Sequence, residues 1–367
     1  MKLRDLVYLL LPKPFARNRL ADAGRQVTRL LVLTNDRNPT FTYYLEERLA
    51  RSALKVDVRS LTARLDDIDP DGLAVILCRY VRPLQLLWLY RNRKRLAAAS
   101  LLIDDDVAAT VTAKQGSGLY KLYLAAIGIA PLPILNRILT EVWVSTPALA
   151  SALSASGSSA KVVLPPFPPA EAFTPLAPDH ADEDRLVMAF HATGSHDGEH
   201  AFLVPIVREA LERCGKLHFE VVAEGRPARL WTEAGLPAGR FTLSPKRDWN
   251  LYLAETARQR TDILLVPLLR SKVNDVRSST KRCDVARMGA AAVFSLCPAY
   301  ERDADPDEIL IENDIRTWVG TICRLAEDGD LRRRTRGATV NAVRMLLTNT
   351  TARLPMTSDN SKDEILT

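Results

Sequence analysis

The segment that decides the fold reads TDILLVP at Thr261–Pro267, then NDVRSSTK at Asn274–Lys281, and finally AAVFS at Ala291–Ser295. The first and last pieces are short apolar runs, which are typical of buried strands in a parallel sheet. The middle piece is a polar turn that predicts a helix opening with Ser278-Ser279-Thr280-Lys281 and ending near Gly289. Free backbone N–H groups and the helix dipole favour anions at such a helix start, so the unit predicts an anion-binding turn.

Lys281 is the unusual residue of this unit, because a cation in the first helical turn opposes the dipole. A bound diphosphate would offset that repulsion. Asp284, one turn later, is placed to accept hydrogen bonds from ribose hydroxyls. The alternative interpretation is a solvated lysine on an exposed helix face, with Ser278 and Ser279 acting only as helix caps.

An acid five positions before a glycine, followed by an apolar strand of small residues, is the pattern of Asp284, Gly289 and Ala291–Ser295. This pattern resembles the donor-binding half of GT-B-fold glycosyltransferases of the group-1, family 4-like type that serve surface-polysaccharide synthesis, O-antigen included. Those enzymes usually carry glutamate where this chain has aspartate. Their first acid would fall at Val276, so Asn274, Asp275 and Ser278 are the candidates to replace it.

The resemblance implies an α/β protein of the GT-B class, with two doubly wound Rossmann-like domains facing across a cleft. It also implies a metal-independent glycosyltransferase that moves a sugar from a nucleotide-sugar donor to a glycan or a lipid-linked acceptor. The donor would be a substrate, and no cofactor is expected. Two alternatives of the same fold remain open: a nucleotide-sugar 2-epimerase, and a protein that binds nucleotide sugar or glycan without turnover.

Strands and helices alternate along most of the chain, which predicts parallel sheets covered by helices. A proline-rich stretch, PPFPP at Pro165–Pro169, interrupts this alternation and predicts a hinge. The predicted parts are a basic amphipathic leader (1–28), an acceptor domain (29–168), a linker (169–184), a nucleotide-sugar-binding domain (185–328), a helix packing back on the first domain (329–350) and a flexible tail (351–367).

The turn HATGSHDG at His191–Gly198 follows the first strand of the second half and contains two of the five histidines. Its glycines allow close approach of backbone to phosphate. An ordinary surface turn is the alternative. Together with the later unit, this turn gives His196 as a catalytic candidate. The predicted donor-binding residues are Thr193, Gly194, Arg270, Asn274, Arg277, Ser278, Ser279, Lys281 and Asp284.

Three carboxylates, Asp104, Asp105 and Asp106, follow the apolar run that ends at Ile103. Ligands of such sheets bind at the carboxyl ends of strands, so Asp104 and Asp105 are catalytic candidates that act as general base or orient an acceptor hydroxyl. The alternative is an acidic N-cap for the next helix, which applies to Asp105 and Asp106. No metal site is predicted.

The chain of 367 residues carries a net charge of +6, a mild basic excess. Basic and aromatic residues gather in the leader, in 86–95 and in 119–139, which suits an anionic membrane surface. No nucleic-acid module is visible. No stretch is expected to cross a bilayer, because the longest charge-free apolar run, Leu122–Leu135, is short and holds two prolines. The five scattered cysteines predict buried free thiols, and the chain is expected in the cytoplasm, peripherally on the membrane's inner face.

Overall fold

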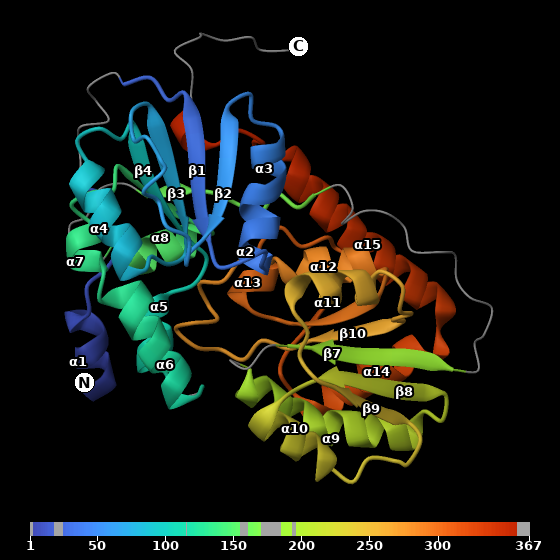
Figure 1. The fold of residues 1–367 in the computed structure, drawn as a ribbon. Coiled ribbons are helices and arrows are strands. Elements are labelled where there is room, and N and C mark those ends of the chain that lie inside the picture. The colour runs from blue at the N-terminus through green and yellow to red at the C-terminus, as the bar shows by residue number, and fades with distance from the viewer. Residues whose placement is uncertain are drawn as a thin grey trace. The chain divides into compact units, whose positions relative to one another are not determined.

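The computed structural model describes residues 3–17, 25–114, 116–154, 161–169, 185–192 and 196–357. The chain forms two compact units, each of which contains its own six-stranded sheet (Figure 1). Unit 1 comprises Met1–Val111, Tyr123–Pro168 and Asn349–Thr367, and unit 2 comprises Thr112–Leu122 and Pro169–Thr348. Two doubly wound α/β units were predicted, and the fold class is confirmed.

The sheet of unit 1 has the strand order β2-β1-β3-β4-β5-β6, and every neighbouring pair is parallel. Its strands are β1 (Arg29–Thr34), β2 (Lys55–Ser60), β3 (Leu73–Cys78), β4 (Ala98–Ile103), β5 (Glu141–Val144) and β6 (Val162–Val163). The two central strands β3 and β4 are buried along their whole length, as apolar runs in a parallel sheet require.

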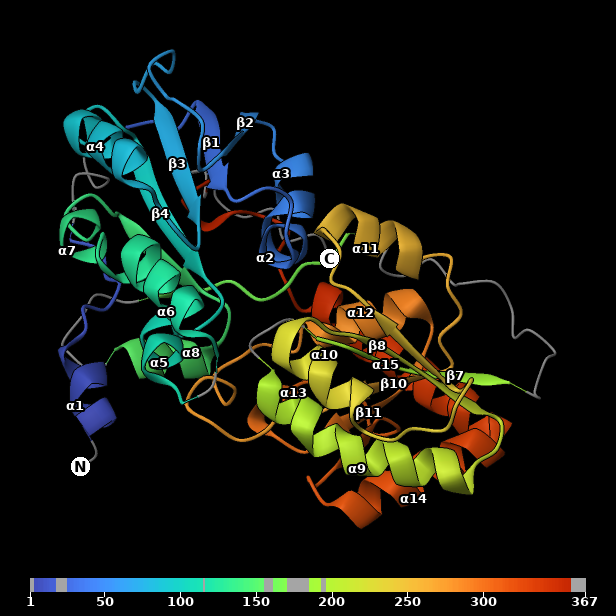
Figure 2. The same cartoon turned by 60° about the horizontal axis from the view of Figure 1, so that its bottom comes forward.

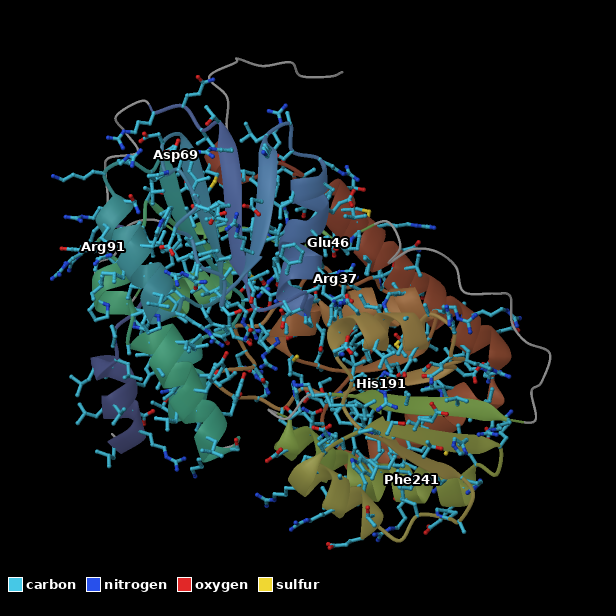
Figure 3. All side chains as sticks on the ribbon, viewed as in Figure 1. Arg37, Glu46, Asp69, Arg91, His191 and Phe241 are labelled. Carbon is cyan, nitrogen blue, oxygen red and sulfur yellow. The ribbon has the colours of Figure 1, made fainter. Side chains whose placement is uncertain are left out.

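The helices of the first half come singly between these strands or in short series. They are α1 (Leu3–Leu10), α2 (Pro39–Phe41), η2 (Thr42–Glu46), α3 (Glu47–Ala50), α4 (Pro83–Asn92), α5 (Val107–Thr112), α6 (Gly118–Leu124), η3 (Ala125–Ile129), α7 (Leu132–Leu135) and α8 (Pro147–Leu153). The helical segment after β1 is divided into three consecutive pieces, α2, η2 and α3. The exposed ion pair Arg37–Glu46, labelled in Figure 3, spans the start of this run at 2.9 Å.

The sheet of unit 2 has the order β12-β11-β10-β7-β8-β9 and is also parallel throughout. Its strands are β7 (Leu186–His191), β8 (Leu217–Val222), β9 (Phe241–Ser244), β10 (Ile263–Val266), β11 (Ala291–Ser295) and β12 (Ile309–Ile311). Its helices are α9 (Asp197–Arg213), α10 (Gly225–Thr232), α11 (Trp249–Thr256), α12 (Lys281–Met288), α13 (Pro298–Glu301), α14 (Ile315–Glu327) and α15 (Gly329–Thr348).

Alternate residues of the unit 2 strands supply two separate cores, one on each face of the sheet. Strand β10 illustrates this: Ile263 and Leu265 join the core under α9, α10 and α14, whereas Leu264 and Val266 join the core under α12 and α13. Figures 1 and 2 show α9 and α10 on one face and α11 and α12 on the other. Both faces are therefore covered, and loops at the strand ends remain for a site.

The last long helix packs within unit 2. A helix packing back on the first domain was predicted at 329–350, and that packing stays a prediction. The helix found there, α15, contacts α12, α14 and β11 of unit 2. The reason lies in its buried small residues, Ala338, Thr339 and Ala342, which allow close approach to these neighbours. Only the segment after α15 returns to unit 1.

That returning segment is held by Arg48, a guanidinium with only 1% of its residue surface exposed. Arg48 donates to the carbonyl oxygens of Tyr44 (2.7 Å), Pro165 (3.0 Å) and Thr351 (3.2 Å), and burial lowers the pKa of Arg48 to about 10. Leu354 is buried as well. The part of the predicted flexible tail that the structure describes, 351–357, is therefore packed against unit 1.

The leader and the apolar stretch in 118–135 also differ from expectation in part. The leader forms α1, none of whose residues is buried. One helical stretch, Gly118–Leu135, is long and apolar enough to cross a membrane by length and composition, with a mean hydropathy of 1.5. The prediction that no apolar stretch reaches this length was therefore wrong. A third of that stretch is buried, and core helices of soluble proteins have the same composition. All five cysteines are free thiols, as predicted.

Candidate functional site

Strands β7 and β10 end at the same edge of the unit 2 sheet, since neighbouring parallel strands run in one direction. β7 ends at His191, whose position is labelled in Figure 3. The His191 ring meets Tyr252 of α11 edge-on, and its Nδ1 lies 3.2 Å from the Tyr252 hydroxyl. Burial, helped by the charge of Lys281, lowers the pKa of His191 to about 4. His191 is therefore neutral at neutral pH.

Lys281 is the first residue of α12, and its ammonium group lies 2.8 Å from Oδ2 of Asp284. Arg287 approaches the other carboxylate oxygen at 3.6 Å. Burial works to lower the pKa of Lys281, but the Asp284 carboxylate outweighs it and the net pKa is raised. Two cations share one carboxylate beside a neutral histidine, so this group has a formal charge of +1. The Lys281 side chain is 32% exposed, which leaves it accessible to an anion.

The helix start differs from the prediction, because α12 begins at Lys281 and Ser278 and Ser279 precede it. The N-cap is Thr280, which makes no side-chain cap hydrogen bond. The alternative in which Ser278 or Ser279 is the N-cap residue is therefore wrong. At the other end the backbone of Gly289 has φ 63°, a left-handed conformation that favours glycine at a helix end.

A second polar group joins the start of α9 to the loop after β10. Glu199, which is 1% exposed, accepts hydrogen bonds from the backbone N–H of Leu269 (3.1 Å) and from Asn274 Nδ2 (3.0 Å). Its other carboxylate oxygen lies 3.5 Å from His196 Nδ1. Burial works to raise the pKa of Glu199, but the contact with His196 and the hydrogen bond from Leu269 leave it lowered. Glu199 is thus a buried carboxylate that fixes the loop.

His196 is engaged on both ring nitrogens within this group. Arg277 Nη1 lies 3.2 Å from Nε2, and since a guanidinium can only donate, Nε2 accepts. The proton then resides on Nδ1, which faces Glu199. This arrangement fits a histidine that positions the loop better than one that transfers protons, in contrast to the catalytic role predicted from the sequence.

The remaining predicted donor residues separate into three cases. Arg270 pairs with Asp275 at 2.8 Å on the exposed side of the loop, and Asn274 is held by Glu199 and by the carbonyl of Leu269. Ser279 is buried. Thr193 and Gly194 lie outside the described residues.

Unit 1 has its own polar cluster, at the carboxyl ends of the adjacent strands β3 and β4. Arg79 follows β3 and lies 3.1 Å from Asp104 and 3.4 Å from Asp105. Thr40 donates its hydroxyl to Asp104 at 2.6 Å. Burial raises the pKa of Asp104, although Arg79 opposes this effect. The structure therefore brings the two predicted acids together around one arginine.

Asp106 does not share this role, because its Oδ1 accepts from the backbone N–H of Ala109 at 2.9 Å and thereby caps α5. Its Oδ2 accepts from the Tyr8 hydroxyl of the leader at 2.7 Å. The helix-cap alternative is thus correct for Asp106. Asp105 and Asp106 both border a small cavity of about 20 Å³, together with Arg79 and Gly128.

Sequence reasoning missed Arg79, Glu199 and Arg287. Arg79 directly follows the apolar run that forms β3, and a cation at a strand end was a usable signal. Glu199 stands three residues after His196, the spacing of neighbours on one helix face. Arg287 carried no comparable signal. Among the residues that the structure describes, no group of three His, Cys, Asp or Glu side chains is arranged to hold a metal ion.

Comparison with known proteins adds evidence on the fold. No family model matches the sequence, and no curated protein matches it. A solved structure of TarM from S. aureus, a variant complexed with Fondaparinux, α-GlcNAc-glycerol and UDP, aligns with TM-score 0.53 and 12% identity over 78% of this chain and 55% of TarM. An O-GlcNAc transferase variant from Thermobaculum terrenum aligns with TM-score 0.51 and 14% identity over 95% of this chain and 68% of that one.

OtsA without ligand aligns with TM-score 0.53 and 11% identity, over 87% of this chain and 96% of OtsA. The chain has the GT-B fold. It spans about half the length of the TarM structures that it matches. At such low identity the likeness concerns the GT-B scaffold alone, on which many different chemistries occur, so the activity has to be argued from the site.

Proposed function

We propose that this chain is a glycosyltransferase that takes a sugar from a nucleotide-sugar donor bound to unit 2 and passes it to a glycan or lipid-linked acceptor bound to unit 1. The proposal includes a role in cell-surface polysaccharide synthesis at the cytoplasmic face of a membrane. It requires no divalent metal, because Lys281 and Arg287 supply the positive charge.

The observation that carries the proposal is the group formed by Lys281, Asp284 and Arg287 at the carboxyl edge of the unit 2 sheet. Its excess positive charge lies at the start of α12, where backbone N–H groups also favour an anion. A nucleoside diphosphate leaving group gains negative charge as the glycosidic bond to its phosphate breaks. A cation fixed beforehand by Asp284 stabilises that charge without costly rearrangement.

Unit 1 contributes the groups that an acceptor hydroxyl needs. A carboxylate whose pKa is raised toward neutrality is a better general base than an ordinary one, and burial has this effect on Asp104. Asp105 and Arg79 are placed to hold the acceptor beside it. In this proposal Asp104 accepts the hydroxyl proton or orients the hydroxyl, and Arg79 binds an oxygen of the acceptor.

A thermal-shift panel of nucleoside diphosphates and nucleotide sugars tests the donor site. One preferred nucleotide should raise the melting temperature. At a hundredfold excess over its Kd, that nucleotide should add about 2.7 kcal/mol to the free energy of unfolding. Lys281→Met should lose most of this stabilisation. Lys216→Met is the matched control, since Lys216 precedes β8 and lies at the opposite end of the strands. Equal stabilisation of both variants would refute the donor role of Lys281.

Binding without turnover is a second candidate, favoured by one observation. Of the residues that could replace the missing first acid, Asn274 is held by Glu199 and Asp275 by Arg270. Release of nucleotide from a donor in the presence of acceptor distinguishes the two. Nucleotide binding with no release from any donor would establish a binding protein.

A further inference from the structure

The leader is attached to unit 1 by specific hydrogen bonds. Asn136, a buried residue, donates from Nδ2 to the carbonyl of Lys13 (2.9 Å) and accepts from the backbone N–H of Phe15 (3.1 Å). Its own carbonyl accepts from the backbone N–H of Arg17 at 3.0 Å. Further back, the Tyr8 hydroxyl bonds to Asp106. The segment from α1 to Arg17 therefore has a defined course over the surface of unit 1.

A half-open pocket of about 440 Å³ lies between the leader and the segments of α7 and α8, and is here named the leader pocket. Three cations line the leader pocket, Lys13, Arg17 and Arg137, and no carboxylate of the described residues does. The Lys13 ammonium lies 3.3 Å from the centre of the Tyr8 ring, and the Arg17 guanidinium lies 4.7 Å from that of Phe15. Aromatic faces of this kind orient a cation and leave its formal charge in place.

The helix that precedes the pocket is apolar and exposed. Leu3 and Leu10 of α1 are 76% and 75% exposed, and Leu6 and Val7 are also exposed. Figures 1 and 2 both show α1 projecting away from the sheet of unit 1. On α7, next to the pocket residue Pro133, Ile134 is exposed as well. An apolar helix beside a basic pocket has the two features that hold a protein at the boundary between lipid headgroups and acyl chains.

We propose that the leader pocket binds the phosphate headgroup of an anionic phospholipid while the leucines of α1 insert into the bilayer surface. The charge of the pocket selects the headgroup, and its apolar walls, including Phe15 and Pro133, accommodate the start of the acyl chains. The inference rests on the membrane part of the proposed function and is independent of glycosyl transfer.

Vesicle co-sedimentation tests the proposal on the full chain. Wild-type protein should bind vesicles of phosphatidylcholine mixed with phosphatidylglycerol much more tightly than vesicles of phosphatidylcholine alone. The double variant Arg17→Gln, Arg137→Gln should bind the mixed vesicles about thirtyfold more weakly, since each basic residue near an anionic surface contributes roughly a fivefold gain. Leu3→Ser, Leu10→Ser should weaken binding to both kinds of vesicle.

The matched control is Arg51→Gln, Arg64→Gln, which removes the same charge from exposed arginines of the same unit that lie outside the three basic stretches. An equal loss in the control would show that only overall charge matters and would overturn the pocket. Inorganic phosphate provides another arm. If free phosphate competes fully with mixed vesicles at millimolar concentration, the site takes soluble phosphate and the lipid proposal is wrong.

Nucleotide binding separates this inference from the proposed activity. The pocket variant should keep the wild-type thermal shift with the preferred nucleotide, because the donor residues lie in unit 2. If vesicle binding behaves as expected while no nucleotide stabilises the protein, the lipid site stands and the proposed function fails. If the pocket variant binds vesicles as well as the wild type does and nucleotide binding is intact, the lipid site is wrong and the proposed function stands.

Discussion

Arg79 is the residue on which the polar cluster of unit 1 depends. It adopts a positive φ of 71°, a conformation that costs energy for any residue except glycine. The backbone bends in this way directly after β3, and its guanidinium then reaches both Asp104 and Asp105. A strained residue that holds two acids together at a strand end is typical of a functional site.

Replacing Arg79 with Met should leave the half-buried Asp104 carboxylate without its cation and raise the pKa of Asp104 further. When the pKa of a carboxyl group is higher in the folded state than in the unfolded state, the free energy of unfolding falls as the pH rises through the folded-state pKa. The variant should therefore lose about 1–3 kcal/mol at mildly alkaline pH and less under mildly acidic conditions. Urea unfolding monitored by circular dichroism measures both values.

The control for that experiment is Arg64→Met, since Arg64 and Asp66 form an exposed pair worth little. Arg64→Met should change stability by no more than a few tenths of a kcal/mol at either pH. A loss for Arg79→Met that does not depend on pH would show that packing matters and that the charge on Asp104 does not.

The sequence predicted individual residues unevenly. Asp104, Asp105 and Lys281 were predicted as site candidates because each follows a recognisable strand or opens a recognisable helix. Their partners Arg79 and Arg287 were missed, because a side-chain contact depends on which strands and turns become neighbours in space. His196 was found by the polarity of its turn, but its contacts with Glu199 and Arg277 indicate positioning.

At the scale of elements, α9 and α14 pack side by side on one face of the unit 2 sheet. Cys214, directly after α9, and Cys323 in α14 place their sulfur atoms 2.8 Å apart. Burial and the neighbouring sulfur raise the pKa of Cys323 to about 12. The two sulfur atoms are therefore near enough to join, and the raised pKa makes the Cys323 thiol a poor nucleophile at neutral pH.

Hydrogen peroxide should join Cys214 and Cys323 in a disulfide, as the two thiols lose two hydrogens and the peroxide is reduced to water. A bond across so long a loop should raise the stability of unit 2, by up to about 4 kcal/mol. Peptide mapping of the oxidised protein identifies the bond, and thermal melting measures its effect. The reaction should be faster in alkaline buffer.

Cys214→Ser should abolish both the bond and the added stability, whereas Cys297→Ser, which alters a buried thiol elsewhere in unit 2, should preserve them. A disulfide that links any other pair of cysteines would contradict the contact between α9 and α14.

Elements were more predictable than contacts, because hydrophobic periodicity is local. The apolar runs 261–267 and 291–295 were predicted as strands, and they contain β10 and β11 with bounds within two residues of those observed. β12 was missed because its three residues are too few for a pattern.

For the whole molecule, stability should depend on buried neutral histidines. Nδ1 of His200 accepts a hydrogen bond from Trp231 Nε1 at 2.8 Å, which requires an unprotonated ring nitrogen. Burial lowers the pKa of His200 to about 4, well below the ordinary value of about 6.5. The unfolded state binds a proton first as pH falls, so the stability contributed by His200 is present above that ordinary value and is lost toward pH 4.

The variant His200→Gln should flatten this dependence, because a glutamine oxygen can accept from Trp231 and does not titrate. The slope of unfolding free energy against pH should fall by up to about 1.4 kcal/mol per pH unit in the acidic range. Chemical unfolding at a series of pH values measures the slope. Parallel curves for the two proteins would rule out His200 as the source.

Truncation tests the return of the chain to unit 1. A chain that ends at Thr348 lacks the Thr351 carbonyl and Leu354, so Arg48 loses one of its acceptors. Unit 1 should be destabilised by about 1–3 kcal/mol while unit 2 keeps its stability. Hydrogen exchange should quicken in β1 and β2 and stay unchanged in β7 and β8. A chain that ends at Thr357 retains every described contact and serves as the control.

The buried guanidinium of Arg48 has a consequence for biosynthesis. Its partners come from three places in the chain, and the last of them follows α15, after all of unit 2. Until the ribosome has added Thr351, Arg48 lacks the hydrogen bond to the carbonyl of that residue. The half of the protein that is made first is thus the half that matures last, and a nascent chain stalled before Thr351 should be open to proteases in its amino-terminal part.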